Sequence, residues 1–226
     1  MSYFVAMNLL RQTKHLFLKE IRLELRQKYA ISGILLYVIS TVFVVYITLG
    51  QQVGGAVWAA LFWIIVLFAS VNAVAKSFVQ ESAKRQLYYY SLANPAAVIL
   101  SKVLYNSLLL LSISFLALAV FTIVLGNPIV HFWLFCQVLF LGSVGFSITF
   151  TFISAISAKA SQSATLMAIL SFPVIIPMLI TLIRLSKIAI NLMADSAYYK
   201  DMLILVCIDV ILLSLSFMLF PFLWRD

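Results

Sequence analysis

Long stretches without charged side chains dominate the sequence and determine its predicted architecture. Four stretches lack Asp, Glu, Lys and Arg, apart from Asp209 in the last of them: 29–75, 103–158, 160–183 and 202–224. A helix crosses the hydrocarbon core of a bilayer with about 20 apolar residues, so each of the first two stretches is long enough for two helices. Glycine-containing polar segments at 50–55 and 126–128 divide them. The pattern therefore predicts six membrane-spanning helices: 29–49, 53–75, 96–125, 130–157, 163–183 and 202–223.

The composition supports a chain that lies mostly in lipid. Of 226 residues, 65% are hydrophobic and 10% are charged, whereas a soluble domain carries about 25% charged residues. Seven acidic side chains are too few to cover a water-soluble globule of this length. We therefore predict an all-α polytopic membrane protein in which residues 1–226 form a single transmembrane domain.

The basic residues are distributed unevenly between the two sides of the predicted bundle. If six helices alternate in direction, the side that holds both termini receives twelve of them: Arg11, Lys14, Lys19, Arg22, Arg26, Lys28, Lys76, Lys84, Arg85, Lys102, Lys159 and Arg225. The other side receives Arg184, Lys187 and Lys200. Because cytoplasmic loops are enriched in Lys and Arg, we expect both termini to be cytoplasmic. The net charge of +8 then reflects orientation and contact with anionic lipid headgroups rather than nucleic-acid binding.

Two polar segments on the predicted cytoplasmic side show helical periodicity. Residues 16–28 place Leu18, Ile21 and Leu25 on one face, which is typical of an amphipathic helix in the membrane interface. This helix is either a simple anchor for the first span or an elbow packed on the bundle. Residues 76–95 are predicted to form a short cytoplasmic helix, after which Asn94 and Pro95 begin the third span as N-cap and first-turn proline.

Two further expectations concern the ends of the spans. The third span is longer than the hydrocarbon core is thick, which puts Lys102 near the cytoplasmic headgroups. On the outer side, residues 184–201 have apolar positions at helical spacing and are predicted to form an interfacial helix.

Pro173 and Pro177 interrupt the fifth predicted span. Proline removes a helix hydrogen bond, but a helix in lipid tolerates it where neighbouring groups bind the freed carbonyls. The hydroxyl of Ser171 is placed to help. We interpret the pair as a helix kink that is either a moving hinge or a static packing feature.

Little in the sequence supports catalysis or a resident cofactor. The seven glycines form no G-x-x-x-x-G-K-[ST] phosphate-binding loop, and no paired carboxylates or His/Cys cluster with metal-ligand spacing is found. His131 is either an axial haem ligand or an interfacial residue of an aromatic belt. Asp209 is either a functional intramembrane carboxylate or a hydrogen-bonded packing residue. Cys136 and Cys207 fall within spans and are interpreted as packing residues.

Three segments, taken in order, resemble the haem exporter protein B (CcmB) family. They are EIRLELRQKYA at 20–30, FVQESAKRQLYYYSLANPAAVILSKVLYN at 78–106, and LSFPVIIPMLI with its P-x-x-x-P pattern at 170–180. Six spans with cytoplasmic termini complete the likeness, which covers the chain from residue 12. The loop sequence ESAKRQLYYYSL departs from the family pattern, because it lacks the glycine and the second acidic residue that many relatives have there.

The resemblance implies an ABC-2-type permease that is not itself an enzyme. Such a permease works as a pair of copies with a separate ATPase subunit, CcmA, in the bacterial inner membrane. It also implies haem delivery for c-type cytochrome biogenesis beside a haem-handling partner, CcmC, with haem as a candidate substrate; whether haem passes through this subunit stays open. On this basis Glu81, Lys84, Arg85 and Tyr88 are the predicted ATPase contacts. Two alternatives stay open: a scaffold that passes ATPase strokes to the haem-handling partner, and an ABC-2 permease for another lipid or drug.

Overall fold

A computed structural model of the chain describes residues 2–26, 28–50, 53–74, 94–157, 163–191 and 198–225. This part of the chain is almost entirely helical and contains no strand. Its helices are α1 (Ser2–Arg26), α2 (Lys28–Leu49), α3 (Gly55–Val74), α6 (Pro95–Leu125), α7 (Phe132–Ser157), α8 (Ser163–Ala189) and α9 (Tyr198–Arg225). The predicted all-α class is confirmed.

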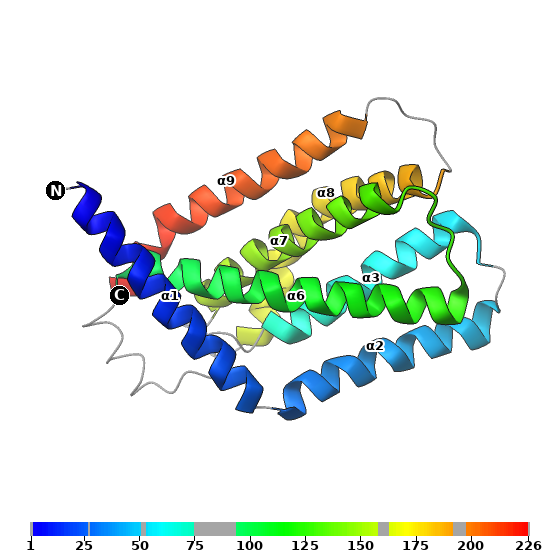
Figure 1. The fold of residues 1–226 in the computed structure, drawn as a ribbon, viewed down its shortest axis with the longest axis horizontal. Coiled ribbons are helices and arrows are strands. Elements are labelled where there is room, and N and C mark those ends of the chain that lie inside the picture. Colours follow the sequence, from blue (N-terminus) through cyan, green and yellow to red (C-terminus); the bar gives the residue numbers. More distant parts are fainter. Residues whose placement is uncertain are drawn as a thin grey trace.

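Six of the described helices are long and apolar enough to cross a membrane, namely α2, α3, α6, α7, α8 and α9. This confirms the predicted number of spans. These helices run side by side along the long axis of the molecule, and both chain termini lie at the same end (Figure 1). The connection between α6 and α7 lies at the opposite end.

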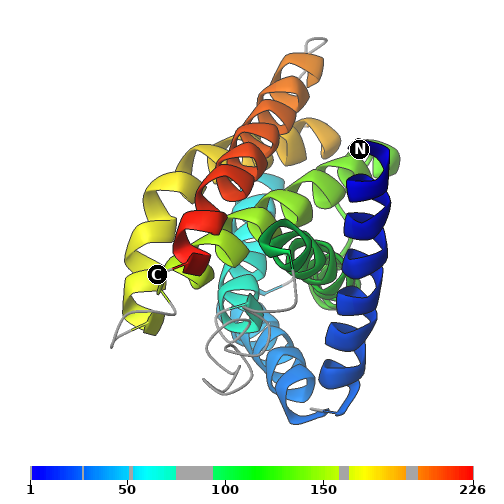
Figure 2. The same ribbon diagram turned by 90° about the vertical axis from the view of Figure 1, so that its left-hand side faces the viewer.

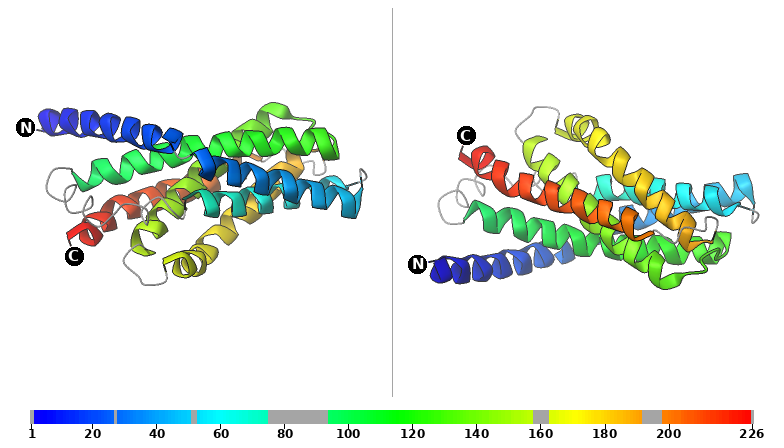
Figure 3. Two further views of the ribbon diagram at one scale, coloured as in Figure 1. Left: turned by 90° about the horizontal axis from the view of Figure 1, so that it is seen from below. Right: turned by 90° about the horizontal axis from the view of Figure 1, so that it is seen from above.

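Helix α7 lies at the centre of the bundle and is the most buried of the six spans. It packs against α3, α6, α8 and α9 (Figure 3). Small residues permit this close packing, and a Cβ on Gly142 would lie only 2.6 Å from the ring of Trp63 on α3. A larger apolar cluster includes side chains of α2, α3, α6, α7 and α8, while a smaller one joins α6, α7 and α9 through Val98, Ile148 and Phe220.

Helix α1 begins much earlier than predicted, at Ser2 instead of residue 16. It lies obliquely across one flank of the bundle at the end that holds the termini (Figure 2). It packs mainly on α6 and makes a few contacts with α2. This arrangement corresponds to the elbow alternative, in which the helix contacts the bundle.

The outer interfacial helix predicted at 184–201 is wrong over its first part. Helix α8 continues to Ala189 because Leu185 and Ser186 are fully buried in the bundle, and Ser186 Oγ accepts a hydrogen bond from Trp63 Nε1 at 2.7 Å. The charged Arg184 suggested the end of the span, but its long side chain extends outward. Its Nε lies 3.0 Å from Oδ2 of Asp201 at the start of α9.

Candidate functional site

The predicted ATPase contacts Glu81, Lys84, Arg85 and Tyr88 lie outside the described residues, as does the rest of the segment 76–95 before Asn94, which we call the coupling segment because coupling to the ATPase is its predicted role. The structure does describe the point where this segment enters the bundle. The candidate site is therefore the junction between α1 and the first turns of α6, together with the polar side chains that continue from it toward α7.

Asn94 begins α6 in the predicted way. Its side-chain Oδ1 accepts a hydrogen bond from the backbone N of Ala96 at 3.0 Å, and Pro95 takes the first helical position. This cap satisfies one of the free N–H groups at the start of the helix. The backbone N of Asn94 in turn donates to Oε1 of Gln12 on α1 at 3.3 Å. Helix α1 therefore contacts the residue at which the coupling segment becomes α6.

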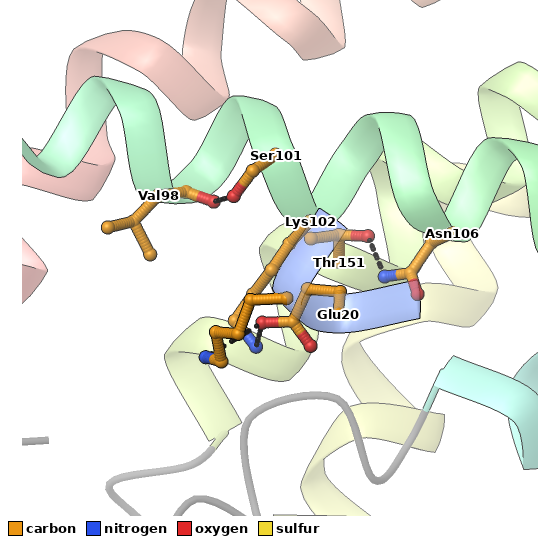
Figure 4. A network of polar contacts seen from close by, with 7 residues as sticks. Glu20, Val98, Ser101, Lys102, Asn106 and Thr151 are labelled. Atoms are coloured by element: carbon orange, nitrogen blue, oxygen red, sulfur yellow. Dashed lines mark hydrogen bonds and ion pairs between the residues drawn. The ribbon is translucent and has the colours of Figure 1, made fainter. Parts of the chain in front are cut away.

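About two turns further along α6, Lys102 forms an ion pair with α1 (Figure 4). The Lys102 side chain is 2% exposed, and its Nζ lies 3.5 Å from Oε1 of Glu20. The same carboxylate oxygen lies 3.2 Å from Nζ of Lys19. Burying an ammonium group is costly unless a carboxylate accompanies it. The sequence predicts Lys102 near the headgroups, and the structure adds that α1 covers it and supplies its counter-charge.

The two contacts between α1 and α6 have the same spacing in sequence. Gln12 and Asn94 are 82 residues apart, and so are Glu20 and Lys102, since 102 − 20 = 82. Equal offsets mean that the two helices run in the same direction across the junction. Two contacts would therefore transmit a displacement of the start of α6 to α1.

Polar side chains continue from the junction into the α6–α7 interface. Nδ2 of Asn106 donates to Oγ1 of Thr151 at 2.8 Å (Figure 4), and nearer the connection between α6 and α7 Oγ of Ser143 donates to Oγ of Ser114 at 3.2 Å. All four residues, which we call the polar seam, are buried. Because lipid offers no hydrogen-bond partners, polar groups inside a bundle must bind one another. The polar seam thus holds α6 and α7 in one register.

Asp209 lies on the side of α9 that faces the bundle, and it is not part of the polar seam. It is 7% exposed, and neither carboxylate oxygen has a hydrogen-bond partner among the described residues. A Cβ on Gly145 would overlap both Oδ1 of Asp209 and the end of the Met178 side chain, so α7, α8 and α9 meet closely here. Because α9 begins at Tyr198 instead of residue 202, Asp209 lies near the middle of its span. The described contacts do not supply the hydrogen bonds that a packing role would require.

Pro173 and Pro177 both lie within the continuous helix α8. Their side chains are exposed, which places them on the side of α8 that faces away from the bundle. Oγ1 of Thr181 donates to the carbonyl O of Pro177 at 2.9 Å. Because Pro177 has no N–H, the carbonyl of Pro173 lacks its usual helical partner. The kink stays a prediction. A bend at this point would change the shape of the α8 surface that faces away from the bundle.

His131 is exposed in the connection between α6 and α7, and its backbone N donates to the end of α8 at 2.9 Å. The exposed rings of Phe132 and Trp133 follow it, 6.4 Å apart. This is the setting of an interfacial aromatic belt. Within the described residues no group of three or more His, Cys, Asp or Glu could hold a metal ion. Cys136 is partly buried and Cys207 is exposed, and both are free thiols.

The sequence analysis missed the polar seam and the role of Glu20. A signal for the seam was present, because Ser143, Ser147 and Thr151 recur every four residues and so share one face of α7. Periodicity does not say which helix that face meets. Glu20 is one of several charged residues on the polar side of α1, and only its contact with Lys102 distinguishes it.

Six spans with α7 at their centre, together with the oblique helix α1 and its polar junction with α6, define a polytopic α-helical membrane protein. A comparison with protein families matches residues 11–222 to the CcmB protein family. The chain therefore belongs to the CcmB family, whose members are membrane components of transport for haem and cytochrome c biogenesis. A comparison with curated proteins gives no match.

Proposed function

We propose that the chain is the non-catalytic membrane subunit of an ABC transporter complex that delivers haem for c-type cytochrome biogenesis. Membership of the CcmB family over residues 11–222 is the observation that carries this proposal. A separate CcmA-like subunit hydrolyses ATP, in keeping with a sequence that contains no phosphate-binding loop. Haem is a substrate of the complex, handled together with a CcmC-like membrane partner.

The junction between α1 and α6 supports a route by which conformational changes of the ATPase subunit are transmitted to the membrane helices. The coupling segment, 76–95, ends at the start of α6, where the backbone N of Asn94 donates a hydrogen bond to Gln12 on α1. The buried pair of Lys102 and Glu20 provides a second link. Movement of the coupling segment would therefore displace α6 and α1 together, and the polar seam would pass the displacement to α7.

The packing of the bundle interior bears on the path of the substrate. Aromatic side chains fill the space between α3 and α6: the ring centroids of Trp58 and Phe62 are 5.5 Å apart, and each lies 5.4 Å from that of Phe121. We infer that haem moves along the outside of the bundle, at a surface shared with a second copy of the chain or with the CcmC-like partner. The exposed, proline-bearing side of α8 is the surface we favour.

The proposed location is the bacterial inner membrane with both termini in the cytoplasm. Both termini lie at one end of the bundle (Figure 1). The described basic residues of α1, including Arg11, Lys14 and Arg22, lie at this end as well, which agrees with the enrichment of Lys and Arg in cytoplasmic segments. Reporter proteins fused to each terminus test this orientation, and a periplasmic location of either terminus would contradict the proposal.

The proposed ATPase contacts can be tested by charge reversal. In Lys84→Glu/Arg85→Glu we expect the ATPase subunit no longer to co-purify with the tagged chain, and cytochrome c maturation to fail at normal membrane abundance. Lys200→Glu is the matched control on the opposite side and should retain both. Undiminished complex and normal cytochrome c in the double reversal would remove the assignment.

A scaffold that transmits the ATPase's movements to the CcmC-like partner is the second candidate, and the closely packed rings of Trp58, Phe62 and Phe121 between α3 and α6 favour it. Purified chain and ATPase in liposomes distinguish the two. ATP-dependent haem flux without the partner would support a pump, whereas the absence of such flux would leave the scaffold standing.

A further inference from the structure

Asp209 takes no part in the coupling route described above, and its surroundings suggest a separate role. The residue is 7% exposed, it lies near the middle of the span Tyr198–Phe222, and its two carboxylate oxygens have no hydrogen-bond partner among the described residues. An ionised carboxylate at this depth is expensive, and acidic residues within membrane-spanning helices mark ion pathways and proton relays.

The space around the carboxylate is apolar and close-fitting. Any side chain larger than hydrogen at Gly145 would collide with Asp209 and Met178, so the backbone of α7 approaches the carboxylate directly. Toward the outer side, Leu205 of α9 belongs to the larger apolar cluster, and toward the inner side Leu212 packs on the smaller one. On this face of α9, Asp209 therefore lies between two apolar residues that both pack into the bundle.

No described cation lies where it would neutralise this carboxylate. Helix α9 packs against α6, α7 and α8, and α7 contains no charged residue. The remaining charged residues of these four helices lie toward the ends of the bundle: Lys102, Arg184, Lys187, Lys200, Asp201 and Arg225. Lys102 pairs with Glu20, and Arg184 pairs with Asp201. The nearest of them along α8, Arg184, is six residues beyond Met178, or about 9 Å along the helix.

We propose that Asp209 is a proton-binding site in the middle of the membrane, occupied when α9 packs on Gly145 and emptied when α9 separates far enough to admit water. A protonated carboxyl is neutral and needs no counter-charge, so it fits an apolar niche that would reject the anion. The flexible side chain of Met178 covers the niche from α8 and can move without displacing backbone. Proton binding is thereby linked to the α7–α9 contact. This inference does not depend on haem being the substrate.

Dicyclohexylcarbodiimide, an apolar reagent for protonated carboxyl groups in membranes, tests the proposal on the intact wild-type chain. The carboxyl O–H adds across a C=N bond of the reagent: oxygen bonds to the central carbon and the proton moves to nitrogen. Migration of the acyl group to nitrogen then gives a stable N-acylurea, so the peptide gains the whole reagent and nothing leaves. Labelled membrane vesicles are digested, and each acidic peptide is quantified by mass spectrometry.

We expect Asp209 to be labelled several-fold more than Glu20 and Asp201, which have cationic partners, and its labelling to fall from acidic to alkaline pH. Labelling no greater than that of Asp201, or labelling independent of pH, would overturn the proposal. If Na⁺ slows the reaction while choline at the same ionic strength does not, the ligand is a metal cation and the proton assignment is wrong.

Asp209→Asn keeps the shape of the side chain but cannot bind and release a proton, and it provides a second readout. Because the folded wild type holds a proton that the unfolded chain gives up, its unfolding temperature should fall as pH rises. The variant should show less of this pH dependence. An identical pH profile in both proteins would show that Asp209 is purely structural and would contradict the proposal.

Discussion

Removing the carboxylate of Glu20 should loosen α1 from the bundle. In Glu20→Gln the buried ammonium of Lys102 stays in place but loses the carboxylate at 3.5 Å. Breaking a fully buried ion pair from one side costs about 3–5 kcal/mol. Glu20 is 15% exposed and Lys19 shares its carboxylate, so solvent screening reduces the effect, and we expect about 2–3 kcal/mol in the free energy of α1 docking.

Two further variants separate the ion pair from other effects of the mutation. Glu20→Gln/Lys102→Met removes both charges and should recover most of the loss, because no ammonium is then left buried beneath a neutral amide. Lys19→Met removes the partly exposed cation from the same carboxylate and should cost about 0–1 kcal/mol. The comparison isolates the buried contact, since all three variants alter the same cluster.

Trypsin reports the docking of α1 in membranes whose cytoplasmic face is accessible, through cleavage after the exposed Arg11 and Lys14. When opening and closing are fast, the cleavage rate follows the population of the opened helix. An effect of about 2–3 kcal/mol then corresponds to cleavage about 30 to 160 times faster in Glu20→Gln. The reasoning is refuted if Glu20→Gln is cleaved at the wild-type rate, or if the double variant is cleaved as fast as Glu20→Gln.

Three further outcomes follow from the contacts of other helices. Gly145→Ala should lower the stability of the detergent-solubilised protein by about 1–3 kcal/mol, as measured by thermal unfolding, whereas Gly33→Ala, which has nothing within 4 Å of its new methyl, should be neutral or stabilise by about 0.5–1 kcal/mol. Asn106→Leu should cost about 1–3 kcal/mol in the same assay, because it removes the 2.8 Å hydrogen bond across the polar seam and leaves a buried hydroxyl on α7. Pro173→Ala/Pro177→Ala should impair cytochrome c maturation at normal membrane abundance if α8 bends at this point, and unaltered maturation would show that the prolines serve packing only.

The sequence by itself determined which segments enter the membrane, how many there are and where α6 begins. Each of these properties is local. Whether a helix enters lipid depends on the summed hydrophobicity of its own side chains. The N-cap at Asn94 depends on the residues next to it. One boundary error among the spans arose at Arg184, where a charged residue was taken to end a span because its ion pair with Asp201 was unknown.

Only the tertiary structure decided which polar residues meet. Glu20 faces Lys102, Asn106 faces Thr151, and the carboxylate of Asp209 faces the bare backbone of Gly145. In each case a helix places its side chains on one face by a rule that the sequence contains. Which face of a neighbouring helix it meets depends on how the helices cross and rotate against one another, and packing over the whole bundle sets this arrangement. In lipid, hydrophobicity does not specify the arrangement, because every outward face is apolar.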